Sequence, residues 1–184
     1  MTKGYLKHIQ GISVDTLNDK GKRMYVSGAA WDKKSNIITV VNHMYAFAIL
    51  ENLSKEEQFE VWDSCNHLKE EFYDFSNILS VFDNDYHETY SDDRVIKYNI
   101  SELQKEVSTI KKELRTRGKL YINHLGAALT LKKEFSICFN IELLLDIAKC
   151  LDKKEVTVYF PKKLAPIVIY GTFGRGMILP TNRR

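Results

Sequence analysis

The sequence contains few of the residues and motifs from which catalytic and metal sites are built. It has three cysteines and five histidines in 184 residues, and none falls in the HxH, HExxH or CxxC spacings that bind metals. It has no GxSxG elbow for a nucleophilic serine. The stretch Gly171–Gly176 has three glycines but lacks the Lys-Ser/Thr pair of a phosphate-binding loop, so a hairpin turn is the better interpretation. We therefore expect neither an enzyme nor a cofactor.

Long apolar runs are also missing. None approaches the length of a membrane span, and the first ten residues, MTKGYLKHIQ, contain no signal-peptide core. The odd set of cysteines, Cys65, Cys138 and Cys150, has no metal spacing and is typical of reduced thiols. These features predict a cytoplasmic protein without a membrane partner.

The charge is unevenly distributed. The formal net charge is +3, yet residues 55–93 carry twelve acidic residues and two lysines, and the rest of the chain has a net charge of +13. A basic body with one acidic block indicates either a polyanionic partner or an electrostatic match between the acidic block and the basic remainder of the chain. A solvated acidic helix on an ordinary protein explains the block equally well.

The first fifty residues favour a β-meander. Alternating apolar residues predict strands at Gly11–Leu17, Met24–Ala30, Ile37–Val41 and Met44–Leu50. The polar stretches at 18–22 and 31–36 supply the turns.

An acidic helix and loop follow at residues 51–94, which we interpret as an insertion. Ser54 and Glu57 fit a capping box, and apolar residues at helical spacing predict a helix from Lys55 to Ile78. Residues 83–93 are polar and acidic and are expected to form a loop. That loop lacks the glycine and closing Glu of an EF-hand, so it does not predict a calcium site.

A second helix carries the clearest nucleic-acid feature. The strand Val95–Ile100 precedes a helix at Glu102–Arg117, for which Ser101 is the expected cap and Gly118 the stop. Leu103, Val107, Ile110 and Leu114 form its apolar stripe. One flank of the helix and a lysine just past its end are basic and could follow phosphates without reading sequence: Lys105, Lys111, Lys112, Arg115 and Lys119. A solvated helix face is the alternative.

The last third of the chain alternates strands with one helix. Strands are predicted at 119–123, 127–131 and 135–139, and Asn140 is a good cap for an apolar helix at 141–151. Strands at Glu155–Phe160, Pro166–Tyr170 and Gly176–Leu179 complete the order. This order of elements predicts an α+β fold.

The order and spacing of these segments resemble a known family. The stretches FNIELLLDIAKCLDKKEVTVYF, APIVIYG and MILPTNRR are similar to the end of the bacterial sliding clamp, the beta subunit of DNA polymerase III. The resemblance covers residues 96–182 well and residues 5–50 loosely. It implies one clamp-like (DNA-clamp) α+β domain over residues 1–184, with antiparallel sheets, helices on one face and the acidic insertion within it.

The resemblance also implies sites and partners. Clamps line their channel with basic helices, which supports double-stranded DNA as a nonspecific partner of the basic helix, with Lys149 added from helix 141–151. The family's groove for polymerase and other clamp-binding peptides corresponds here to Met177, Leu179, Pro180, Met44 and Tyr45. The segment 40–48 lacks the family's Asp, Gly and Arg, and for Met177 and Leu179 ordinary core packing is the alternative.

The sequence favours two functions over a third, a small hydrolase with a spatially assembled site that involves His43 or His124. One is a DNA replication accessory protein that associates with DNA as a homo-oligomer, since one domain cannot encircle a duplex. The other is a non-encircling clamp-fold regulator or adaptor, of phage or mobile-element type, that acts through protein contacts. In the second case the acidic segment 55–93 would serve as an interaction surface or a DNA mimic.

Overall fold

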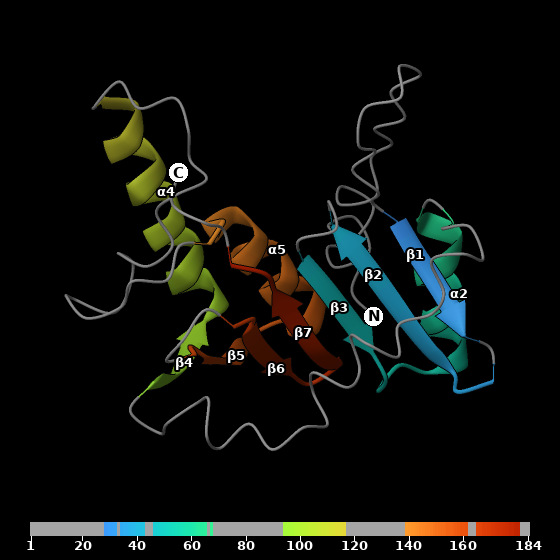
Figure 1. The fold of residues 1–184 in the computed structure, drawn as a ribbon. Coiled ribbons are helices and arrows are strands. Elements are labelled where there is room, and N and C mark those ends of the chain that lie inside the picture. Colours follow the sequence, from blue (N-terminus) through green and yellow to red (C-terminus); the bar gives the residue numbers. More distant parts are fainter. Residues whose placement is uncertain are drawn as a thin grey trace.

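The computed structural model describes residues 28–32, 34–42, 46–65, 67, 94–116, 139–161 and 165–180. Their strands form one antiparallel sheet in the order β1-β2-β3-β7-β6-β5-β4 (Figure 1). The strands are β1 (Gly28–Asp32), β2 (Ile37–Asn42), β3 (Ala46–Leu50), β4 (Val95–Asn99), β5 (Glu155–Tyr159), β6 (Ile167–Gly171) and β7 (Gly174–Ile178). The helices are α2 (Lys55–Ser64), α4 (Ile100–Thr116) and α5 (Ile141–Leu151).

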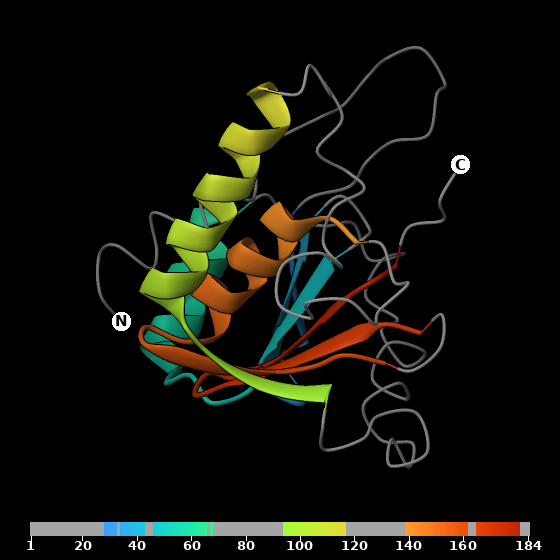
Figure 2. The same cartoon turned by 90° about the vertical axis from the view of Figure 1, so that its left-hand side faces the viewer.

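The three helices of the described ranges lie on one face of the sheet (Figure 2). The side chains of Ala46, Ala48 and Leu50 in β3 join one core cluster with residues of α2, α4 and α5. Alternate residues point to the other face, as strand geometry requires. This arrangement confirms the expected α+β class with an antiparallel sheet and helices on one face.

Helix α5 packs across the centre of the sheet. Asn140 caps it by accepting a hydrogen bond from the Glu142 backbone N–H at 2.9 Å, and most of its residues from Ile141 to Leu151 are buried. The predicted helix therefore has the bounds and the cap that the sequence indicated. Burial raises the pKa of the Cys150 thiol well above its usual value, and the nearby Asp146 and Cys65 raise it further.

The junction between β3 and β7 joins the two parts of the sheet. Strand β3 belongs to the N-terminal meander and β7 to the C-terminal part, and they pair from Ala46↔Ile178 to Leu50↔Gly174. Strands β6 and β7 are joined by a two-residue turn at Thr172 and Phe173, so the glycine-rich stretch is a hairpin, as predicted. Strand β7 begins at Gly174, two residues earlier than expected.

Two helix boundaries differ from the predictions. Ser54 and Glu57 do form the capping box of α2, but the helix ends at Ser64 instead of running on to Ile78, because Cys65 has an extended backbone. Beyond it, His67 stacks on Trp62 with ring centres 3.8 Å apart and pairs with Ala29 of β1. This non-local packing ends the helix.

The start of α4 is the second difference. The helix begins at Ile100, and the side chain of Asn99 accepts hydrogen bonds from the backbone N–H of Ser101, at 2.9 Å, and from its hydroxyl, at 2.6 Å. Asn99 therefore takes the capping role that we had given to Ser101. Because the helix starts earlier, the strand before it, β4, ends at Asn99.

The structure describes the other predicted elements to different extents. Strand β1 extends through Trp31 to Asp32, and the turn residues that the structure describes are 34–36, where Asn36 has a φ of 62°. The predicted strands at 11–17, 119–123 and 127–131, and the loop 83–93, lie outside the described residues. Within the described ranges, none of the helices combines the length and the apolar character that a membrane span requires.

Candidate nucleic-acid and partner surfaces

The exposed side of α4 is the candidate nucleic-acid surface. A shallow depression runs along this side of the helix, and we refer to its lining residues as the basic face: Ser101, Gln104, Lys105, Ser108, Thr109 and Lys112. All six are exposed, whereas Leu103 and Val107 on the opposite side are buried in the core. The amphipathic pattern of the sequence thus positions the two lysines toward solvent.

The spacing on the basic face suits two separate phosphate contacts. Lys105 and Lys112 are seven residues apart on α4, which corresponds to two helical turns and about 10 Å. That distance is comparable to the width of a DNA major groove, about 12 Å. The two ammonium groups could therefore reach phosphates on either side of a groove.

The hydroxyl groups between the two lysines contribute little to the binding of an anion. The Ser108 hydroxyl donates to the Gln104 carbonyl oxygen at 2.8 Å, and the Thr109 hydroxyl donates to the Lys105 carbonyl oxygen at 3.0 Å. Their protons are used within the helix, so these two hydroxyl groups are not spare donors to an anion. On the neighbouring flank, burial raises the pKa of the Glu106 carboxyl.

The other four predicted DNA-binding residues are Lys111, Arg115, Lys149 and Lys119. Lys111 and Arg115 lie in α4. Lys149 is half-buried in the last turn of α5, the helix that packs beside α4. Lys119 lies outside the described residues.

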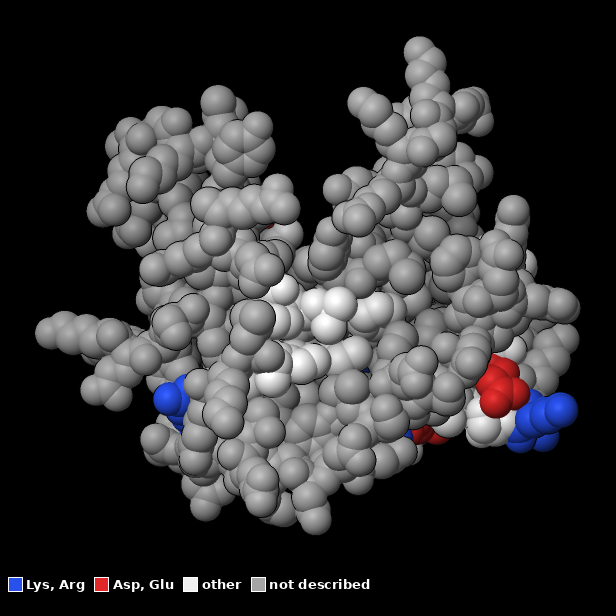
Figure 3. Space-filling view, in the orientation of Figure 1, with Lys and Arg blue, Asp and Glu red and all other residues white. Residues whose placement is uncertain are grey.

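Of the residues predicted for the partner groove, Met177 lies near the end of β7 and on the sheet face without helices. Met177 pairs with Phe47 on one side and Val168 on the other, and these three side chains form an apolar row with Val41. Met177 is only 2% exposed, whereas Leu179 and Pro180 beyond the strand are half-buried. Uncharged side chains are visible at the centre of this face over β3 and β7 (Figure 3). Met44 and Tyr45 lie outside the described residues.

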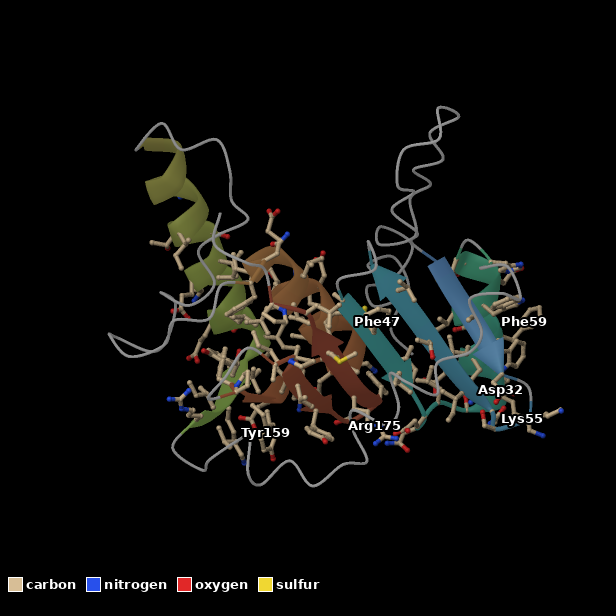
Figure 4. All side chains as sticks on the ribbon, in the orientation of Figure 1. Asp32, Phe47, Lys55, Phe59, Tyr159 and Arg175 are labelled. Atoms are coloured by element: carbon tan, nitrogen blue, oxygen red, sulfur yellow. The ribbon has the colours of Figure 1, made fainter. Side chains whose placement is uncertain are left out.

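Sequence reasoning missed Arg175 on the same sheet face. Its guanidinium group forms an ion pair with the Glu51 carboxylate at 2.9 Å, close to the β3–β7 junction (Figure 4). The two residues are 124 positions apart, so no local pattern could have paired them. Within the described part of the chain, no cluster of His, Cys, Asp and Glu could hold a metal ion.

Comparison with known proteins supports the fold. Neither protein-family models nor curated sequences gave a match. Among solved structures, the chain is similar to the Helicobacter pylori beta clamp bound to a DNA ligase peptide, with a TM-score of 0.50 and 14% sequence identity. The fold is clamp-like. The similarity covers 97% of this chain and 62% of that clamp, so the chain spans less than two thirds of the length of the whole protein.

Proposed function

We propose that this clamp-like protein is a non-enzymatic accessory factor that associates with duplex DNA through the basic face of α4. The observation that carries the proposal is the placement of Lys105 and Lys112, two turns apart on one exposed helix side of a clamp-like fold. Lysines in this arrangement neutralise phosphates and release counterions, which gives affinity without sequence preference.

Partner binding is the second part of the proposal. The solved neighbour is a clamp bound to a DNA ligase peptide. In this chain, a short peptide from a polymerase or another clamp-binding protein would contact the end of β7, where Leu179 and Pro180 are half-buried beside Met177. If the protein encircles DNA, several copies must associate, as expected from the size of one chain.

Salt dependence tests the DNA contact. The logarithm of the DNA association constant should fall linearly with the logarithm of salt concentration. Changing both Lys105 and Lys112 to Gln should reduce the magnitude of that slope by about two and lower the affinity at low salt at least about tenfold. Fluorescence anisotropy with two duplexes of unrelated sequence measures both quantities.

A matched control separates local contact from net charge. Lys34→Gln with Lys154→Gln makes the same charge change at two exposed turn positions, and it should leave the slope nearly unchanged. If both double variants lost the same amount of DNA affinity, α4 would not be the surface that contacts DNA. No measurable binding by the wild-type chain at low salt would contradict the DNA proposal as a whole.

The second candidate function, a clamp-fold adaptor, is favoured by the exposed acidic side of α2. One form of that idea is that the acidic segment covers the basic helix within the same chain. The described part of this segment, α2, packs against β1, whereas α4 packs against β4, and these strands are at opposite edges of the sheet. Helix α2 therefore does not cover α4 of its own chain, and an adaptor would use α2 toward another molecule.

A further inference from the structure

An aromatic side chain is presented to solvent on α2. Phe59 is 58% exposed and lies at the outer end of the molecule, far from Tyr159 at the other end of the sheet (Figure 4). Glu56, Glu60 and Asp63 are exposed on the same side of the helix, while Gln58 and Val61 on the opposite side are fully buried. We refer to Glu56, Phe59, Glu60 and Asp63 as the acidic face.

The acidic face and the basic face have matching spacings. On α2, Glu56 and Asp63 are seven residues apart, with Phe59 and Glu60 between them. On α4, Lys105 and Lys112 are also seven residues apart, and the small side chains of Ser108 and Thr109 lie between them. Each spacing corresponds to about 10 Å along a helix.

The two faces are also complementary in shape and charge. Carboxylates at the ends of one helix segment would meet ammonium groups at the ends of the other. The Phe59 ring would then enter the shallow depression over Ser108 and Thr109, where the neighbouring lysines can pack against the aromatic face.

These faces cannot meet within one molecule. Helices α2 and α4 lie on the same side of the sheet but at its opposite ends (Figure 1). We propose that the acidic face of one copy of this chain docks on the basic face of a second copy. The contact is head-to-tail, because each copy has one face of each kind, so repetition produces either a closed ring or a chain of copies.

Two properties follow from the small size and high charge of the contact. Two helix faces bury less surface than a stable dimer needs, so the association is weak and weakens further with added salt. The acidic face also occupies the surface proposed to contact DNA, so duplex DNA competes with the second copy. Self-association is independent of the proposed function, whereas this competition rests on it.

Charge reversal on either face tests the docking. The acid-reversed variant carries Glu60→Lys and Asp63→Lys, and the base-reversed variant carries Lys105→Glu and Lys112→Glu. Sedimentation velocity at low ionic strength, up to several hundred micromolar protein, should show wild-type self-association. Each variant alone should associate at least about tenfold more weakly. A chain carrying all four changes should recover association, because both charges of each pair are exchanged.

A mixture distinguishes a head-to-tail contact from a symmetric one. A chain with Glu60→Gln and Asp63→Asn keeps an intact basic face, and a chain with Lys105→Gln and Lys112→Gln keeps an intact acidic face. Because the neutralised faces attract neither each other nor an intact face, mixing these two chains should give a two-chain complex that grows no further. Phe59→Ala should weaken wild-type association, while Glu155→Lys, an exposed charge change on β5, should not.

The outcomes separate this proposal from the DNA proposal. A monomeric wild-type chain throughout the concentration range, or an oligomer unchanged in both reversed variants, would overturn the docking whatever the result with DNA. Docking without measurable DNA binding would overturn only the proposed function. If both hold, adding duplex DNA should reduce the self-associated fraction, and the acid-reversed variant should still bind DNA.

Discussion

Replacing Gly174 with valine is expected to lower the free energy of unfolding by about 4 kcal/mol, which is a large part of the roughly 5 to 15 kcal/mol of an ordinary domain. Gly174 has a positive φ of 154°, a conformation that residues with a side chain rarely adopt. A Cβ atom at this position would also collide with the backbone carbonyl of Ile49 in β3. The substitution thus strains β7 and disrupts the β3–β7 junction.

Urea denaturation followed by circular dichroism measures this effect. Thr157→Val on β5 is the control, since it also introduces valine into a strand at a half-buried position, and it should change stability by less than about 0.5 kcal/mol. A Gly174→Val chain as stable as the wild type would mean that β3 and β7 do not pair in the register found here.

Replacing Asp152 with alanine should lower the free energy of unfolding by about 1 to 2 kcal/mol at neutral pH. Its carboxylate follows α5 and accepts hydrogen bonds from the backbone N–H groups of Lys154, at 2.8 Å, and Thr172, at 2.9 Å, as well as from the Thr172 hydroxyl. It therefore ties the end of α5 to the start of β5 and to the β6–β7 turn.

The same hydrogen bonds make this contribution dependent on pH. Burial alone would raise the pKa of Asp152, but the bonds from Thr172, Lys154 and Glu155 outweigh it and lower the pKa to about 2. A lowered pKa means that the stabilisation is complete above the unfolded-state value, about 3.9, and is lost as pH falls toward 2.

Denaturation curves between pH 7 and pH 3 test this dependence. The difference in the free energy of unfolding between wild type and Asp152→Ala should be constant near neutral pH and shrink below about pH 4. Thr172→Val removes one hydrogen-bond donor, so it should lower the free energy of unfolding by less than Asp152→Ala does. The stability of this variant should still fall in acid. A difference that stays the same down to pH 3 would contradict the assignment of the pKa to these hydrogen bonds.

Local sequence signals predicted the elements that local interactions determine. The cap at Asn140 and the apolar face of residues 141–151 define α5. The Ser54 capping box starts α2, and the hairpin between β6 and β7 follows from its glycines. The exposed position of Lys105 and Lys112 follows equally from helical periodicity. Each of these features involves residues a few positions apart.

Features that depend on distant residues were not predictable in the same way. Helix α2 ends early, just before His67 pairs with Ala29 of β1, which is distant in the sequence. The periodicity beyond Ser64 still resembles a helix, so the early end could not be predicted from local patterns. The β3–β7 junction and the Arg175–Glu51 ion pair join residues more than a hundred positions apart. The opposite placement of α2 and α4, on which the docking proposal depends, also follows only from the strand order.

Site-specific photo-crosslinking tests the central claim most directly. A benzophenone amino acid would replace Ser108, in the middle of the basic face, or Lys97, which is exposed on β4 and points to the sheet face without helices. With duplex DNA at low salt, we predict crosslinks from position 108 that disappear as salt is raised, and far fewer from position 97. DNA binding with crosslinks mainly from position 97, or with none from position 108, would contradict the claim that α4 forms the DNA-binding surface.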